Sequence, residues 1–419
     1  MEMGTELSTS LDCDGGHNDN EKKETKEGNE EEIWWGALPD DAVLEILSRL
    51  PPKAFFRSKC VSKTWLALSS PASRLNKLLQ PTLMGFFWET RYEIGFTDIS
   101  GGGGGGVGGG VAAVDGTLRA LPPYDECEIL ACCNGLLLVQ CLNCGPYIFS
   151  TNYAYNPATR KHTAIGWSRP VTPKSSDEVL YSVFSLAFDP RDGLHFHVVC
   201  FWHSHDVEGG CTNVFSTFSS HSGSWQQGGT LGCALKITEY SNGTFLDGRV
   251  HRVTQGHEIM SIDPINNSYL VTKFDFPGSS DNIGFSEIGQ SQGLLHFMFG
   301  NQSRRVSIWV SEKGDLRKWI FKHQLSLDGM HFGDVYGSFW HIKLHPEKDS
   351  LFVHLGNGHI LSIELRTGKS NEICILPNTD CHTVWLYMPS WFDFNYPPAL
   401  CSDPAYDASD TSDTSDREE

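Results

Sequence analysis

Five cysteines lie within 18 residues and are the first candidates for metal binding. They are Cys127, Cys132, Cys133, Cys141 and Cys144, and the last two form a Cys-x-x-Cys pair. A structural zinc ion needs four converging ligands, usually supplied by two such pairs. Cys132 and Cys133 are neighbours on a predicted strand, so their side chains point to opposite faces and only one could join. The pattern therefore favours buried thiols in a β-core over a zinc site.

Other residue types that support catalysis do not form a recognisable constellation. His203 and His205 share a strand face, but no third ligand stands nearby in the sequence. The carboxylates that could cleave a glycosidic bond, such as Asp189, Asp263 and Asp275, occupy predicted turns. The chain has no Gly-x-Ser-x-Gly elbow. We therefore predict no catalytic residue, no metal and no cofactor.

A run of glycines, Gly101–Gly110, is interrupted only by Val107. Glycine loops can cradle phosphate, but this one lacks a following Gly-Lys-Ser/Thr and a helix behind it. We interpret it as a flexible, low-complexity loop.

The charge of the chain is concentrated at its two ends. The 419 residues carry a net charge of −19, of which residues 1–32 hold −8 and residues 401–419 hold −6. Both ends lack a periodic apolar face, so we predict disordered acidic tails over 1–32 and 399–419. No basic cluster is present that would indicate a nucleic-acid partner.

The sequence shows no apolar run of the length that a membrane helix needs, and its acidic start lacks the apolar core of a secretory signal. Its 13 cysteines are an odd number, which favours reduced thiols. We therefore expect a protein of the cytoplasm or nucleus with no membrane partner.

Residues 33–80 are the only stretch whose apolar residues recur at helical spacing. An Asp of the pair Asp40-Asp41 can cap a first helix, which Pro51-Pro52 should end. Five apolar residues form one stripe of that helix: Val43, Leu44, Ile46, Leu47 and Leu50.

Three further signals extend this helical module. A second helix should carry Phe55, Phe56 and Cys60. Ser62 has the type and position of an N-cap for a third helix, and Ser70-Pro71 should start a last one. A module of about 45 residues buries so little surface that its stability on its own is marginal. The pattern leaves open whether the module is a cap that docks on the rest of the chain or a surface for a partner.

The run LPDDAVLEILSRLPPKAFFRSKCVSKTW, residues 38–65, resembles the F-box. Ser58 and Ser73 depart from the family, which usually has larger apolar residues there. The resemblance implies that the module binds a Skp-type adaptor of a cullin ubiquitin ligase. Carried over position by position, the adaptor-binding residues would be Leu38, Pro39, Leu44, Leu47, Leu50, Pro51, Cys60, Val61 and Trp65.

From residue 81 to 398 the pattern changes to short β-rich runs separated by turns. Gly-led apolar runs recur in CNGLLLVQ, LDGRVHRVT and SQGLLHFMF. Strands about ten residues apart are typical of a sandwich, barrel or propeller, and the length favours a propeller of six or seven blades. The fold class is thus α+β multidomain, with a small helical module before a large all-β domain.

The β-domain also resembles a known type. CNGLLL, YNPATRK and SSHSGSW make it similar to the F-box-associated and kelch-like domains that follow plant-type F-boxes, although a full kelch motif does not recur in each blade. Tryptophans dominate binding hot spots but also pack between sheets. The candidate substrate contacts are Trp202, Trp225, Trp340 and Trp385.

Together these features favour a non-catalytic substrate-recognition subunit of a Skp-cullin-F-box ubiquitin ligase. The F-box would bind the adaptor and, through it, the cullin, while the propeller would bind a protein target for ubiquitination. Two alternatives stay open. One is a propeller enzyme or small-ligand sensor with a helical cap, and the other is an F-box scaffold that acts outside the ligase.

Overall fold

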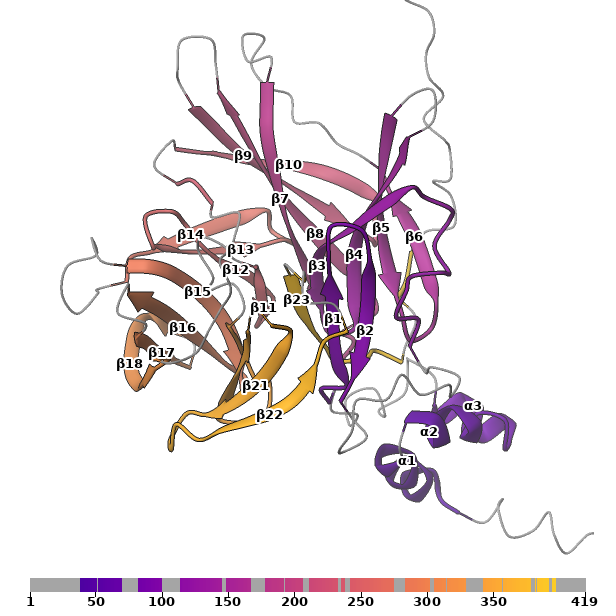
Figure 1. Cartoon of the computed structure of the whole chain (residues 1–419). Coiled ribbons are helices and arrows are strands. Elements are labelled where there is room, and N and C mark those ends of the chain that lie inside the picture. The colour runs from indigo at the N-terminus through magenta and orange to yellow at the C-terminus, as the bar shows by residue number, and fades with distance from the viewer. Residues whose placement is uncertain are drawn as a thin grey trace, which may run out of the picture.

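The computed structural model describes three helices and 23 strands (Figure 1). The predicted tails and the glycine run lie outside the described residues. None of the described helices is both long and apolar enough to cross a membrane. The described residues are 38–50, 52–69, 82–99, 114–144, 148–166, 178–191, 193–205, 211–232, 235–237, 242–274, 283–301, 305–313, 315–328, 342–355, 357–377, 381, 383–391 and 394–396.

Three short helices form the N-terminal module: α1 (Asp40–Arg49), α2 (Pro52–Ser58) and α3 (Lys63–Leu68). Pro39 is the N-cap of α1, so the prediction of an aspartate cap was wrong; both aspartates instead lie in the first turn, where carboxylates favour the helix dipole. Leu50, which precedes a proline, takes an extended conformation and ends α1. Cys60 was also misplaced, because α2 ends before it.

The β-domain contains five four-stranded antiparallel sheets in which consecutive strands are neighbours. The first two sheets consist of β3 (Glu126–Cys133), β4 (Leu136–Cys144), β5 (Ile148–Asn156) and β6 (Lys161–Ile165), and of β7 (Glu178–Phe188), β8 (Phe196–His205), β9 (Cys211–Ser219) and β10 (Ser224–Leu231). The next two consist of β11 (Thr244–Leu246), β12 (Arg249–Val253), β13 (Ile259–Asp263) and β14 (Ser268–Thr272), and of β15 (Ile283–Ser291), β16 (Leu294–Asn301), β17 (Arg305–Glu312) and β18 (Asp315–Ser326). The fifth consists of β19 (Ile342–Leu344), β20 (Ser350–His354), β21 (His359–Glu364) and β22 (Ser370–Ile375).

A sixth sheet joins the two ends of the β-domain. Strand β1 (Gly85–Glu89) pairs on one side with β2 (Ile94–Asp98) and on the other with β23 (Thr383–Tyr387). The register places Gly85 opposite Tyr387 and Glu89 opposite Thr383. The six sheets are the blades of a β-propeller, which confirms the predicted fold and fixes the blade number at six. Figure 1 shows β1 and β23 beside each other although they come from opposite ends of the domain.

Hydrophobic clusters fill the interfaces between neighbouring blades all the way round the ring. Alternation along β1 illustrates how one strand serves two interfaces. Phe86 and Trp88 pack towards the β19–β22 blade, whereas Phe87 packs towards the β3–β6 blade. Each blade therefore packs apolar side chains against both of its neighbours.

The Gly-led runs seen in the sequence are the first hairpins of three blades. Asn134-Gly135 joins β3 to β4, and Asp247-Gly248 joins β11 to β12. Both residues of each pair have positive φ, 46° and 86° in the first and 50° and 75° in the second. Two residues with positive φ are the signature of the type I′ hairpin, which favours Asn or Asp followed by Gly.

We predict that Phe87→Ala destabilises the propeller by about 3–5 kcal/mol, because the ring is fully buried and lies edge-on to Tyr387 across the closing sheet. Urea unfolding followed by tryptophan fluorescence measures the change. Tyr92→Ala is the control, since Tyr92 is 88% exposed and its loss should change stability by no more than about 0.5 kcal/mol. Equal effects of both substitutions would contradict the closing role of β1.

The closing sheet also predicts a pH dependence. Burial, with a smaller contribution from the neighbouring Glu128, raises the pKa of Glu89 to about 8. The folded state then holds a proton that the unfolded state releases near pH 4.5, so stability should fall by a few kcal/mol as pH rises from about 5 to about 8. Glu89→Gln keeps an acceptor for the N–H of Ile129 and should flatten this fall. Unfolding midpoints at both pH values test it, and an equally steep fall in the variant would contradict the assignment.

Candidate functional site

The helical module has a small core of its own. Five side chains are buried within it: Val43, Leu44, Leu47, Phe55 and Trp65. Leu38, Leu50 and Leu68 are partly buried and pack against them. Three residues of the stripe read from the sequence, Val43, Leu44 and Leu47, thus face inward on α1 and meet one aromatic residue from each of the other two helices.

The hydroxyl groups of two serines form hydrogen bonds within the second half of this module. The Ser62 hydroxyl accepts a hydrogen bond from the Trp65 backbone N–H at 3.1 Å, which confirms Ser62 as the N-cap of α3. Ser58, which departs from the family pattern, is buried, and its hydroxyl donates to the Phe55 carbonyl at 2.6 Å. The helix backbone therefore satisfies the hydroxyl that the departure introduces.

The predicted adaptor-binding residues fall into three groups. Leu44, Leu47 and Trp65 belong to the core of the module, and Leu38 and Leu50 are half-buried at its margin. The remaining described positions are exposed: Pro39, Cys60 and Val61. Pro51 lies outside the described residues.

Two exposed apolar residues were missing from that set. Ile46 on α1 is 38% exposed, and Leu66 on α3 is 53% exposed, close to the 54% of Val61. Ile46 belonged to the helical stripe read from the sequence, but periodicity alone does not separate the side chains that face the core of a small module from those at its edge. A module of this size cannot cover all its apolar side chains, and those left outside suit the centre of an interface.

The candidate substrate-contacting tryptophans lie mainly inside the propeller. Trp202 and Trp385 are 5% and 7% exposed and belong to clusters on either side of the β3–β6 blade, which leaves them almost no surface for a ligand. Trp225 is half-buried, and its indole N–H donates to the Gly166 carbonyl. Trp340 lies outside the described residues.

The cysteines and histidines that could have bound a metal have other surroundings. Burial raises the pKa of the Cys132 and Cys133 thiols, and each S–H donates to a backbone carbonyl. His203 is buried and its Nδ1 lies against the Asn213 amide oxygen. Within the described part of the chain, no three His, Cys, Asp or Glu side chains converge as metal ligands would.

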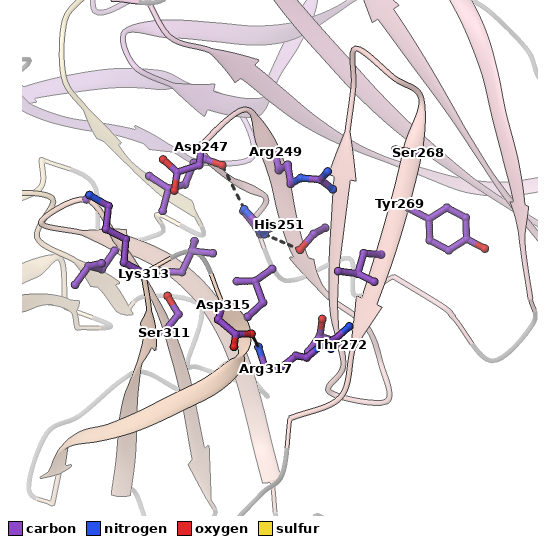
Figure 2. Close-up of a pocket in the computed structure, with 17 residues that line it drawn as sticks. Asp247, Arg249, His251, Ser268, Tyr269, Thr272, Ser311, Lys313, Asp315 and Arg317 are labelled. Carbon is purple, nitrogen blue, oxygen red and sulfur yellow. Dashed lines mark hydrogen bonds between the residues drawn. The ribbon is translucent and has the colours of Figure 1, made fainter.

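A cleft of about 580 Å³ lies between the β11–β14 blade and the β15–β18 blade. In Figure 2, Asp247 and Lys313 are drawn at one end of it, and Thr272, Asp315 and Arg317 at the other. The cleft is of a size that ligand sites commonly have. Nothing in the sequence pointed to it, because its two walls come from different blades.

His251 lies at the centre of the cleft (Figure 2) and is held neutral. Its Nδ1 lies 2.7 Å from the Ser261 hydroxyl and its Nε2 3.4 Å from the Leu246 carbonyl. Burial lowers the pKa of His251 to about 4. The imidazole therefore supports the wall through hydrogen bonds and adds no charge at neutral pH.

A second, smaller cavity of about 150 Å³ lies among the innermost strands β3, β11, β15, β19 and β23. Its charged residues bind one another: Lys343 Nζ lies 3.3 Å from Glu287 Oε1. Buried Arg252, behind Glu287, donates to the Phe184 carbonyl and the Ser185 hydroxyl. These contacts link strands of neighbouring blades, so we interpret the cluster as structural.

The chain thus consists of a small helical module with exposed apolar side chains and a six-bladed propeller that follows it. The F-box domain family matches residues 35–74. An F-box protein of Arabidopsis thaliana is 27% identical over 69% of this chain and 70% of its own length. A protein of the same plant named as an F-box/kelch-repeat protein is 25% identical over 66% and 72%. F-box only protein 8 of Arabidopsis thaliana is 50% identical over 10% of this chain and 14% of its own. Residues 35–74 are thus an F-box domain, and the chain, which carries a C-terminal β-propeller, is similar to F-box proteins of a plant.

We predict that Leu47→Ala unfolds the helical module and spares the propeller. Leu47 is fully buried, and its truncation should remove about 2–5 kcal/mol from a module with little stability to lose. Hydrogen exchange over residues 40–68 measures local unfolding. Ile46→Ala, one position away but 38% exposed, should leave protection nearly unchanged. Protection retained in Leu47→Ala would contradict an independent core in the module.

Proposed function

We propose that this chain is the substrate-recognition subunit of a Skp-cullin-F-box ubiquitin ligase. The observation that carries the proposal is the F-box match over residues 35–74 together with the exposed apolar side chains Ile46, Val61 and Leu66 on the folded module. Some apolar side chains of a small module stay exposed to water, and covering them with a partner stabilises the complex by about 25 cal/mol per Å² of apolar surface buried. A Skp-type adaptor is the partner that an F-box implies.

The proposed division of labour follows from the two parts of the chain. The module would contact the adaptor, and through it the cullin, while the propeller would hold a protein target. Ubiquitin transfer is then accelerated by proximity, because a target lysine held near the activated ubiquitin reacts as if in one molecule. This mechanism requires no catalytic residue in the chain. Action in the cytoplasm or nucleus remains a prediction from the cysteine content.

The propeller suits this task for a mechanical reason. Its blades are packed on both faces by the hydrophobic clusters described above, so the hairpins at their ends are presented from a stiff support. Recognition sites are commonly built from loops held by such a scaffold. A scaffold role outside the ligase would use the same surfaces and differs only in the absence of a cullin from the complex.

We predict that the double substitution Val61→Asp and Leu66→Asp weakens binding of a Skp-type adaptor by about a hundredfold or more. The change places two charges where apolar surface would be buried, and the side chains are too exposed for the module to depend on them for folding. Pull-down and surface plasmon resonance with purified adaptor measure the loss, and circular dichroism checks the fold.

Ile265→Asp is the matched control, because Ile265 is a 70% exposed aliphatic residue in the propeller. It should bind adaptor as the unmodified chain does. Unchanged adaptor binding by the double variant would show that Val61 and Leu66 lie outside the contact surface. A complex that contains adaptor but never cullin would favour the scaffold role.

A further inference from the structure

We propose that the cleft between the β11–β14 and β15–β18 blades binds an extended acidic peptide segment of the target protein. This inference rests on the proposed function, since it names the kind of segment that the propeller would present to the ligase. It is carried by the charge of the cleft, by its apolar lining and by the outer position of β14 among the strands that the structure describes.

Positive charge exceeds negative charge in the cleft, although the chain as a whole carries −19. Three cationic residues line it, Arg249, Lys313 and Arg317, against two acidic ones, Asp247 and Asp315. Neither Lys313 nor Arg317 forms an ion pair with any residue that the structure describes. Both are exposed, so a ligand can reach them.

The carboxylate of Asp315 is engaged within its own hairpin. It accepts the backbone N–H of Arg317 at 3.0 Å and lies 3.9 Å from Lys318 Nζ. Arg249 on the opposite wall pairs with Asp263 at 3.6 Å. Lys313, between β17 and β18, and Arg317, on β18, are thus available to a carboxylate of the ligand. The guanidinium of an arginine can bind a carboxylate through two parallel hydrogen bonds.

The remaining lining fits the other parts of a peptide. Leu246, Leu294 and Leu316 supply apolar surface that an aliphatic side chain can cover. Strand β14 is the outermost strand of its sheet among the described strands, and four of its residues line the cleft: Ser268, Tyr269, Leu270 and Thr272. Its outer edge therefore offers backbone N–H and C=O groups to a second extended chain. A segment with acidic residues beside an aliphatic residue would satisfy all three features.

The test uses the full-length chain and a fluorescein-labelled synthetic peptide of Glu, Asp and Leu, measured by fluorescence anisotropy. A peptide with Gln and Asn in place of the acids is the neutral control. We expect only the acidic peptide to bind, and added salt to weaken it. The double variant Lys313→Glu with Arg317→Glu should weaken binding by about tenfold or more. If that variant folds poorly, Lys313→Gln with Arg317→Gln serves instead.

A matched variant lies on the equivalent hairpin of the next blade. Arg366 and Lys369 are exposed on the β21–β22 turn, and Arg366→Glu with Lys369→Glu makes the same change of charge outside the cleft. It should bind the acidic peptide unchanged. Equal losses in both variants, or equal binding of acidic and neutral peptides, would overturn the proposal. So would binding that appears only after residues 401–419 are deleted, because the acidic tail would then be the occupant.

Adaptor binding is measured in parallel to separate this inference from the proposed function. The cleft variant should bind a Skp-type adaptor as the unmodified chain does. If the unmodified chain binds the peptide but no adaptor, the proposed ligase function fails while the cleft assignment stands.

Discussion

The pairing of β1 with β23 is the contact on which the rest of the structure depends. It brings together residues near position 87 and residues near position 385 and turns a row of sheets into a ring. Every blade then buries both of its faces, and none is left at an open end. The clusters between blades cover the two faces of each sheet that the structure describes, whereas the F-box module leaves part of its apolar surface exposed.

The two parts of the molecule therefore solve different physical problems. The propeller is large enough to bury its apolar residues and can leave polar clefts between blades, such as the one around His251. The helical module is too small to do so: it covers Leu47 completely and leaves Val61 and Leu66 about half exposed. A rigid platform that tolerates varied surface residues, joined to a small module that gains stability from a partner, is the arrangement that a recognition subunit requires.

Local signals in the sequence predicted local structure well. Ser62 caps α3 as expected, and the Gly-led runs are hairpins whose two turn residues have positive φ, a conformation that Asn-Gly in one run and Asp-Gly in another adopt readily. The closing pair of strands and the cleft could not be predicted, since each joins residues far apart in the chain and short-range periodicity carries no information on such pairing. For the same reason the sequence did not separate Leu47, which is core, from Leu66, which is surface, and it offered Trp202 and Trp385 as contacts although both fill blade interfaces.

Isothermal titration calorimetry of the unmodified full-length chain with a purified Skp-type adaptor tests the central claim most directly. The account predicts a one-to-one complex whose heat capacity of binding is clearly negative, because apolar surface of the module is removed from water. Absence of binding, or binding with a heat capacity change near zero, would contradict the claim that the exposed apolar edge of the F-box module is an adaptor interface.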